Sequence, residues 1–326
     1  MSSRQFPTVK FRPRRIGHAN LFVGNLERSM AFYGRVCGIE EVRREPGIEA
    51  GFLSNGNTHH DIGLMQSGEG SRIGRDGYVQ PSSQRGFKPG LNHFGWEVDN
   101  EASLVAAWRR ASEADLPLHQ TTDHQISHSV YIFDPDGNLH EFYADVVDDW
   151  RAIFNPSRED LVSGKWDPAA DAPDPKPHYE ASPELRRMNA APLHPLRLTS
   201  VSVVARDLAR MRAFLTDVAG LEPLSEDGRS FFFAGALGRP DLELLPAREG
   251  QRPGLCQIAF ELPAGEDLDA SAAQLDALGI LIEERVDRPE KAAIVLKDPD
   301  GLRVEFIRPS NALAVPAEVA QTVRVG

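Results

Sequence analysis

Alternating polar and hydrophobic positions near the start of the chain predict a strand that runs into a helix. The alternation places His18, Asn20 and Phe22 on one face of the strand. Asn25 follows as a suitable helix N-cap, and Gly38 is suited to end that helix. Strand-like runs at 49–54 and 58–66, separated by the turn signal Asn-Gly, then complete a β-α-β-β unit. The stretch 39–43 is compatible with one further strand.

The same order of elements recurs in residues 90–143. A strand is predicted at 90–98, a helix at about 101–114, and a hairpin around the sequence DPDG. In that turn Pro135 fixes its own φ angle, and Gly137 tolerates the positive φ that a tight turn can require. The flanking runs VYIF and LHEFY therefore predict two paired strands.

The second half of the chain repeats the first. The segment RLTSVSVVARDLARMRAFLTDVAGLEPL (197–224) aligns without a gap with RIGHANLFVGNLERSMAFYGRVCGIEEV (15–42). Likewise, GLCQIAFEL aligns with GLNHFGWEV, and DPDGLRVEFI with DPDGNLHEFY. We therefore predict an α+β fold of four βαβββ modules, paired into two domains that each have a cupped mixed sheet and flanking helices.

Composition narrows the class of protein. A hydrophobic fraction of 41% fits a globular fold, and the net charge of −12 argues against nucleic acid as a partner. No apolar run is long enough to span a membrane, and the basic N-terminal stretch lacks the apolar core of a signal peptide, so we expect a cytoplasmic protein. Cys37 and Cys256 lie in different halves of the chain and are expected to be reduced thiols.

Three side chains occupy matching strand positions in the first half and suggest a metal site. His18 and His93 lie on the opening strands of the first two modules, and Glu141 lies on the closing strand of the second. A carboxylate inside an apolar strand is costly unless it is paired or bound to a metal. The second half provides an internal comparison, because its corresponding residues include no histidine and are Ser200, Gln257 and Glu305.

Two imidazoles and one carboxylate form a facial triad, which leaves adjacent positions on Fe(II) open for a bidentate substrate and O2. We therefore predict that residues 1–150 form the metal-bearing catalytic domain and 197–310 a degenerate repeat without the metal site. A Pro/Asp-rich linker at 151–196 and a tail at 311–326 complete the predicted organisation. A weaker alternative is a residual oxygen-rich site in the second domain, formed by Glu243 with Gln257 and Glu305.

The motifs GHANLFVGNLERSMAFY, NHFGWEV and DPDGNLHEFY resemble the vicinal-oxygen-chelate superfamily, and in particular its type I extradiol dioxygenases. The resemblance covers all four modules for the fold and about residues 15–145 for the active-site motifs. It implies that His18, His93 and Glu141 hold Fe(II), with Mn(II) as an alternative. In this family, two-domain members usually carry the metal in the C-terminal domain, so the N-terminal site is a departure that weakens any transfer of substrate preference.

The resemblance also implies three catalytic residues. THHDIGLM resembles the strand that carries the family's acid–base histidine, which would be His60. Tyr131 lies ten residues before Glu141, as the family's active-site tyrosine does, and DHQISHSVY suggests His124 as a further histidine near bound oxygen. His128 is less suitable, because on an extended chain it points away from Tyr131. His128 and three other histidines, His59, His119 and His140, are expected at the surface or in a second layer.

The predicted function is ring cleavage of a catechol-type substrate, a small aromatic diol, with O2 and insertion of both oxygen atoms. In this interpretation His60 transfers a proton, His124 and Tyr131 hydrogen-bond to bound oxygens, and Phe22 and Trp96 shape the pocket. The loop at 67–90 is either a lid, with Arg72, Arg75 or Arg85 meeting an acidic substituent, or a solvated loop. A homo-oligomer is expected, with no nucleic-acid or membrane partner.

Two other classes stay open. A metal-dependent lyase or isomerase of the glyoxalase or epimerase type usually needs a fourth protein ligand on the closing strand of the first module, where HHDIGLMQ offers no Glu. A non-catalytic small-molecule-binding protein would need neither the triad nor His60.

Overall fold

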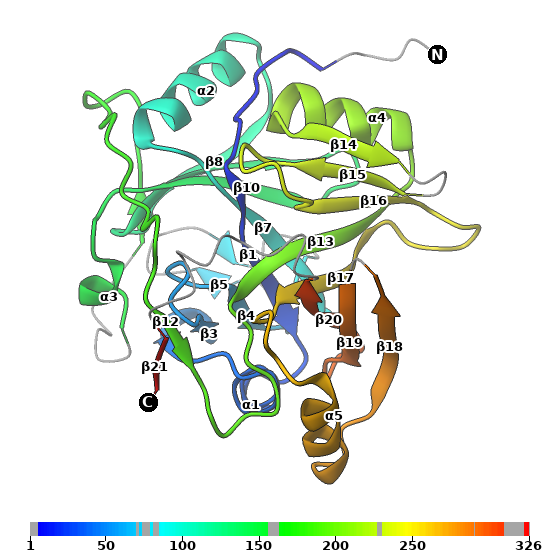
Figure 1. Ribbon diagram of the computed structural model, residues 1–326. Helices are drawn as coiled ribbons and strands as arrows, with labels where there is room; N and C mark the ends of the chain where they lie inside the picture. Colours follow the sequence, from blue (N-terminus) through cyan, green and yellow to red (C-terminus); the bar gives the residue numbers. More distant parts are fainter. Residues whose placement is uncertain are drawn as a thin grey trace.

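The computed structural model describes residues 6–69, 72–73, 79–80, 85–155, 163–226, 230–289, 291–309 and 323–325 (Figure 1). The first two modules contain β1 (Arg15–Val23), α1 (Leu26–Ala31), the π-helix η1 (Phe32–Val36), β2 (Glu41–Glu45), the 3₁₀ helix η2 (Pro46–Ile48), β3 (Ala50–Leu53), β4 (Ile62–Gln66), β5 (Arg72–Ile73), β6 (Val79–Gln80), β7 (Gly90–Glu97), α2 (Glu101–Glu113), β8 (Leu118–Asp123), β9 (Ser127–Phe133) and β10 (Leu139–Asp145).

The remaining elements are α3 (Trp150–Ile153), β11 (Gly164–Lys165), β12 (Leu185–Arg187), β13 (Arg197–Ala205), α4 (Leu208–Ala213), the π-helix η3 (Phe214–Ala219), β14 (Glu222–Glu226), β15 (Phe231–Ala234), β16 (Leu242–Pro246), β17 (Gly254–Glu261), α5 (Leu268–Ala277), β18 (Ile282–Arg288), β19 (Lys291–Lys297), β20 (Arg303–Pro309) and β21 (Val323–Val325).

Two large mixed sheets confirm the predicted α+β fold of paired modules. Modules one and two form the first sheet, in the order β11-β8-β9-β10-β7-β1-β4-β3-β2. Modules three and four form the second, in the order β14-β15-β16-β13-β17-β20-β19-β18. In each sheet the two opening strands pair antiparallel at the centre, β1 with β7 and β13 with β17. The DPDG hairpin is also confirmed, with β9 antiparallel to β10 and Gly137 at φ +87°.

The strand predicted at 58–66 begins later in the structure. Residues 58–61 form bends, and β4 begins only at Ile62. The preceding connection is held in a compact loop, because the Ser54 hydroxyl donates to the Thr58 carbonyl at 2.7 Å and to the Asp61 carboxylate at 2.9 Å. His60 therefore lies in a loop directly before a strand and is not part of the strand.

Local signals determine both ends of the first helical segment. The Asn25 side chain accepts a hydrogen bond from the Arg28 amide at 2.9 Å, as predicted for an N-cap. Gly38 follows the segment at φ +72°, a conformation that residues with a Cβ rarely adopt. In the third module, Asp207 caps α4 and Gly220 ends η3 at φ +77°, so the repeat extends to both ends of the segment.

The two domains are joined by reciprocal hydrogen bonds. Asp61 of the first domain accepts from the backbone amide of Leu198, and Asp241 of the second accepts from that of Ile16, both at 2.9 Å. In Figure 1, α2 and α4 lie at the top and α1 and α5 at the bottom, so module two faces module three and module one faces module four. The Tyr33 hydroxyl accordingly donates across the seam to Asp298 at 3.0 Å.

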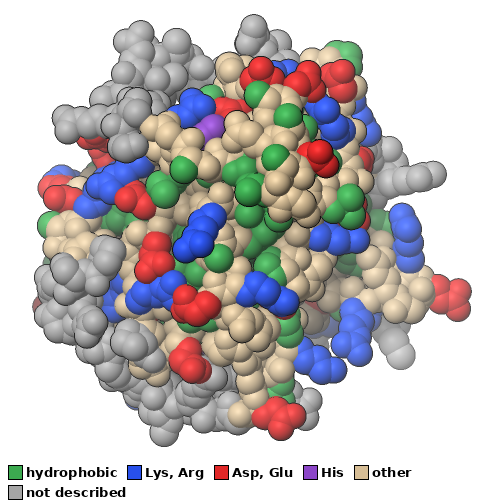
Figure 2. Space-filling view, turned by 90° about the horizontal axis from the view of Figure 1, so that it is seen from below, with side chains coloured by type: hydrophobic (Ala, Val, Ile, Leu, Met, Phe, Trp, Pro, Cys, Tyr) green, Lys and Arg blue, Asp and Glu red, His purple; other side chains and the backbone are tan. Residues whose placement is uncertain are grey.

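Hydrophobic side chains form one continuous core through both domains, and a second, smaller cluster combines side chains of the first domain with Phe154 from the segment that follows it. The smaller cluster includes Phe22, Phe52 and Met65, which lie on the same face of the first sheet as Asn20. Figure 2 shows the lower face of the molecule, where Lys/Arg and Asp/Glu side chains are interspersed around hydrophobic ones. Among the described residues, no helix combines the length and apolar character needed to cross a membrane.

Candidate metal centre

Three predicted ligands meet at the centre of the first sheet. The Nε2 atom of His18 lies 2.8 Å from Glu141 Oε2, and His93 Nε2 lies 2.9 Å from the same oxygen. The two Nε2 atoms are 3.3 Å apart. All three side chains are buried, so three potential donor atoms converge in a site largely shielded from water.

The spacing of these atoms fits a facial triad. With metal–ligand bonds of about 2.1 Å, two ligands at a right angle lie about 3.0 Å apart, against about 3.4 Å at a tetrahedral angle. The two separations to Glu141, 2.8 and 2.9 Å, are closer to the first value, whereas the 3.3 Å between the two Nε2 atoms is closer to the second. Two imidazoles and a carboxylate at such angles suit an octahedral ion of the Fe(II) or Mn(II) type.

Strand register explains why these side chains meet. His18 and Glu141 both lie opposite Gly95 on β7, from β1 on one side and β10 on the other. The glycine is required for space, because a Cβ at position 95 would overlap the His18 ring. His93 lies on the same face, two residues away along β7.

Burial sets the protonation states of the triad. Burial lowers the pKa of His18 to about 4 despite the opposing effect of Glu141, so the ring is neutral near pH 7. Burial alone would raise the pKa of Glu141, but its polar contacts with His124, His18 and His93 outweigh it and hold that pKa well below its ordinary value. The site thus offers a neutral imidazole at His18 and an ionised carboxylate at Glu141.

The second oxygen of Glu141 is held by hydroxyl groups. Tyr131 donates to Oε1 at 2.7 Å, and Ser129 donates to the same atom at 2.6 Å. His124 Nε2 lies 3.0 Å from the Tyr131 hydroxyl and 3.4 Å from Glu141 Oε1. Both predicted residues therefore lie beside the triad. Ser129 was not predicted, although its position two residues before Tyr131 places it on the same face of β9.

His60 also lies beside the triad, with its ring stacked on that of His18 at 4.0 Å between centroids. Its Nε2 atom is 3.1 Å from Asn20 Oδ1. Since an amide oxygen only accepts, Nε2 carries the proton and Nδ1 is the basic atom. Burial, with a smaller effect of His18 and His59, holds the pKa of His60 well below its ordinary value. Sequence reasoning placed Asn20 on this face but gave it no role.

A second group of histidines is close enough to be considered. Ring nitrogens of His18, His59 and His60 lie within 4.8 Å of one another. The His18 and His60 rings, however, are stacked with 30° between their planes, and because ring lone pairs lie in those planes, a face-to-face pair is poorly suited to bind one ion. The set with His93 and Glu141, whose atoms point at one another, is the better metal site.

Comparison with known proteins identifies the family of the chain. The profile of the Glyoxalase/Bleomycin resistance protein/Dioxygenase superfamily matches residues 15–142 and 197–306, most of the chain. The protein belongs to this superfamily. Its two matched segments correspond to the two sheets. The resemblance to the vicinal-oxygen-chelate superfamily is thereby confirmed.

Individual relatives include dioxygenases. A catechol-2,3-dioxygenase from Bacillus subtilis (strain 168) is 27% identical over 302 residues, which are 90% of this chain and 96% of that protein. A Mn(II)-bound glyoxalase from Novosphingobium aromaticivorans aligns with a TM-score of 0.62 at 17% identity, over 97% of this chain and 88% of that one. A homoprotocatechuate 2,3-dioxygenase variant from B. fuscum aligns with a TM-score of 0.61 at 17% identity, over 92% and 72%. The two structures show a shared fold.

The second domain of this superfamily member has a charge network where the first has the triad. Glu305 accepts from Lys291 at 2.9 Å and from Gln257 at 3.0 Å, and the Glu243 carboxylate accepts from Ser202 at 2.7 Å. A lysine ammonium thus supplies the positive charge beside the buried carboxylate. Glu243, Gln257 and Glu305, which would form the alternative oxygen-rich site of the second domain, are thus engaged in these hydrogen bonds.

Other predicted residues lie elsewhere. Trp96 does not shape the pocket: it packs on the other face of β7, and its indole donates to His140 at 3.0 Å. Its distance of three residues from His93 already implies the opposite face. His128 points away from the site as expected and lies 2.6 Å from Glu101. His59 is a second-layer residue 5.8 Å from His18 between ring centroids.

Parts of the predicted lid, residues 70–71, 74–78 and 81–84, lie outside the described residues, and so do Arg75 and the side chain of Arg72. Arg85 is described: its guanidinium donates to the backbone carbonyl of Asn92, and its Cζ lies 5.1 Å from the centre of the Phe133 ring. The two cysteines are free thiols, as predicted.

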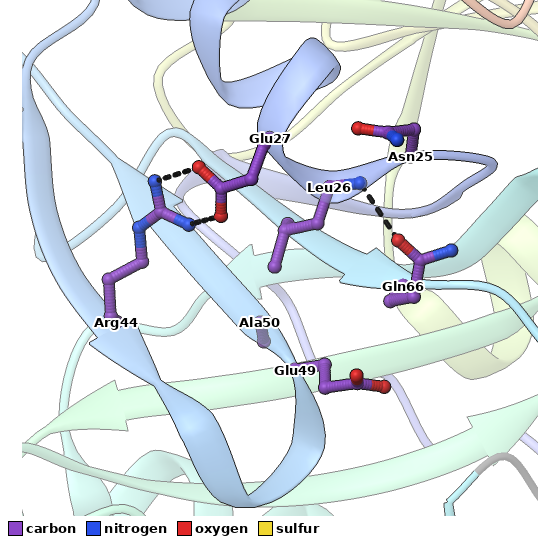
Figure 3. A pocket seen from close by; sticks show the side chains of 7 residues that line it. All are labelled: Asn25, Leu26, Glu27, Arg44, Glu49, Ala50 and Gln66. Carbon is purple, nitrogen blue, oxygen red and sulfur yellow. Dashed lines mark hydrogen bonds and ion pairs between the residues drawn. The ribbon is translucent and has the colours of Figure 1, made fainter.

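A hollow of about 470 Å³ at the far end of β1 and β4 is a separate feature (Figure 3). Its polar groups are satisfied internally, because Arg44 pairs with Glu27 at 2.5 Å and Gln66 accepts from the Leu26 amide at 2.9 Å. It shares no lining residue with the triad, and we assign it no role in chemistry.

Proposed function

We propose that this protein is an Fe(II)-dependent extradiol dioxygenase that cleaves the aromatic ring of a catechol-type substrate with O2, with Mn(II) as the alternative ion. The proposal depends on one observation, the convergence of His18, His93 and Glu141 at the spacing of a facial triad. The full-length similarity to a catechol-2,3-dioxygenase supports it.

His18, His93 and Glu141 would hold the ion, which would act as a Lewis acid and lower the pKa of the diol hydroxyl groups. Ser129 and Tyr131 fix the orientation of Glu141 through its other oxygen. Tyr131 and His124, hydrogen-bonded to each other, form the polar wall beside the triad.

His60 is the proposed acid–base residue. Its protonated Nε2 is fixed by Asn20, which leaves Nδ1 to take a proton from the substrate and return it later. Its lowered pKa keeps the ring neutral, and hence able to accept a proton, near pH 7.

An apolar wall adjoins this base. The ring centroids of Phe52 and Phe154 lie 5.1 and 6.2 Å from that of His60, and both phenylalanines belong to the small hydrophobic cluster. This wall is suited to pack against an aromatic ring and to exclude water.

The competing lyase or isomerase has less support. It would require a ligand on β4, whose sequence IGLMQ is described throughout and has no carboxylate. Its one amide, Gln66, already donates to the carbonyls of Gly24 and Ser67 at 3.0 Å. A non-catalytic binding protein would not need the converging triad or an oriented base.

An aerobic assay distinguishes these classes. Apo-protein is reconstituted anaerobically with Fe(II) and then mixed with catechol and O2, while oxygen uptake and the absorbance of the ring-opened product are recorded. Stoichiometric oxygen uptake with product formation supports the proposal. Metal binding without oxygen uptake across a panel of substituted catechols would overturn it. The homo-oligomeric state, the cytoplasmic location and the lid stay predictions.

A further inference from the structure

A β-bulge lies immediately beside one of the metal ligands. On the β1–β7 ladder Asn20 lies opposite His93, but the next residue, Leu21, lies opposite Leu91. Asn92 is therefore the extra residue on β7. Adjacent side chains on a regular strand point to opposite faces, whereas a bulge can re-aim one of them.

The re-aimed Asn92 side chain contacts the ligand next to it. Its Oδ1 atom lies 2.7 Å from His93 Nδ1, and its Nδ2 donates to the Met65 sulfur at 3.4 Å. The backbone carbonyl of the same residue accepts from Arg85. Asn92 is buried, so its side-chain contacts are shielded from competing water.

These contacts determine which nitrogen of His93 is free. The sulfur can only accept, so Nδ2 is the amide atom that faces Met65 and Oδ1 is the atom that faces the imidazole. An accepting oxygen beside Nδ1 requires Nδ1 to carry the proton. The lone pair of His93 is then on Nε2, the atom that lies 2.9 Å from Glu141.

We propose that Asn92 is a positioning residue for the metal centre: the bulge turns its amide oxygen toward His93, fixes the tautomer with the lone pair on Nε2, and thereby raises metal affinity. The inference rests on the proposed metal-binding role of His93. Outer partners of this kind commonly account for 10–100-fold of metal affinity.

The second domain provides a matched control. Its ladder has the same bulge, with Ser202 opposite Gln257 and Val203 opposite Leu255, and the extra residue is Cys256. The Cys256 thiol donates to the carbonyl of Ser202 at 3.2 Å and orients no imidazole. The bulge is thus a property of the repeated backbone, and the orienting amide is a property of the first domain.

The test measures Co²⁺ binding to the full-length apo-protein, by chelator competition and by the visible spectrum of the bound ion, without substrate. Three variants are compared with the wild type: Asn92→Leu, Asn92→Asp and Cys256→Ala. Thermal unfolding of each apo-protein is recorded in parallel, and the protonated nitrogen of His93 is identified from its ¹⁵N chemical shifts.

We expect Asn92→Leu to weaken Co²⁺ binding about 10–100-fold, with loss of the fixed His93 tautomer. Asn92→Asp retains an accepting oxygen and should restore the affinity, and Cys256→Ala should leave it unchanged. A purely structural role predicts instead that Asn92→Leu lowers the unfolding temperature while the Co²⁺ affinity and spectrum stay those of the wild type. That result overturns the inference, as does equal weakening by Asn92→Leu and Asn92→Asp.

The outcome is separable from that of the proposed function. A wild type that binds Co²⁺ and responds to these variants, yet cleaves no catechol, supports the inference and contradicts the dioxygenase. A wild type that binds no ion overturns both.

Discussion

In the first domain β1 and β7 pair with His18 opposite Gly95 and Asn20 opposite His93, whereas in the second domain β13 and β17 pair with Ser200 opposite Ala259 and Ser202 opposite Gln257. Register shifts occur at the same two places in each ladder. The closing strands also correspond, with Glu141 opposite Gly95 and Glu305 opposite Ala259. The backbone therefore brings the same three positions together twice.

The difference lies in the side chains and in the space left for them. The Cβ of Ala259 occupies the place where, in the first domain, a Cβ would overlap the His18 ring. An imidazole at position 200 would meet the same obstruction. Lys291 supplies a fixed positive charge to Glu305, where the proposed ion would serve Glu141. One fold thus brings together either two imidazoles and a carboxylate or an ion pair, depending on a few residues.

The largest expected effect on metal binding and turnover comes from replacing each of the two matched carboxylates with glutamine. Glu141→Gln removes the anionic ligand and should abolish stoichiometric iron binding and essentially all turnover. Glu305→Gln changes only the contacts with Lys291 and Gln257 in the second domain and should leave both unchanged. Metal analysis of the two purified variants decides. Iron retained by Glu141→Gln, or lost from Glu305→Gln, would reverse the assignment of the domains.

Replacing the proposed base separates chemistry from metal binding. The position in the second domain that corresponds to His60 is Pro240, so the second domain has no imidazole at the place of the proposed base. We expect His60→Gln to lower kcat by about 10²–10⁴-fold, because the proton acceptor is lost, while the iron content stays that of the wild type. His128→Gln is the control, since that ring points away from the triad. Unchanged kcat in His60→Gln would remove His60 from the mechanism.

Filling the space at Gly95, beside the His18 ring, should lower turnover less than the two preceding changes. Gly95→Ala adds a Cβ that overlaps the His18 ring and must displace it. We expect turnover to fall about 100-fold, the usual result of moving an active-site group by about 1 Å. The reverse change, Ala259→Gly, should leave turnover unaltered. Steady-state kinetics at saturating Fe(II) test both variants, and normal activity in Gly95→Ala would show that the ring is not confined.

The seam between the domains should respond to pH. Burial raises the pKa of Asp241 from 3.8 to about 6, against the opposing hydrogen bonds from Gly235 and Ile16. A raised folded-state pKa contributes stability below pH 3.8 that is lost as the pH rises through about 6. The free energy of unfolding of the wild type should therefore fall relative to Asp241→Asn, by at most about 3 kcal/mol, between pH 4 and pH 7. Denaturant titrations across that range measure the difference, and parallel pH curves would contradict the shift.

The architecture and the convergence of the three candidate ligands could be predicted from the sequence because both depend on local periodicity. The two-residue alternation assigns His18, His93 and Glu141 to defined faces, and the DPDG turn pairs Tyr131 with Glu141. The internal repeat then shows which strands are equivalent and which domain has lost its histidines. The alternation, the turn and the repeated motifs are each visible within short stretches of sequence, so they can be recognised without the tertiary structure.

Other features depend on contacts between distant segments, and only the tertiary structure decided them. The cross-domain hydrogen bond of Asp61 helps hold the loop before β4, and that loop places His60 over His18. The bulge at Asn92 departs from the alternation on which strand faces are predicted, so its amide could not be assigned to the His93 side. The sequence determines which side chains share a face, whereas the packing of remote segments determines how they are oriented there.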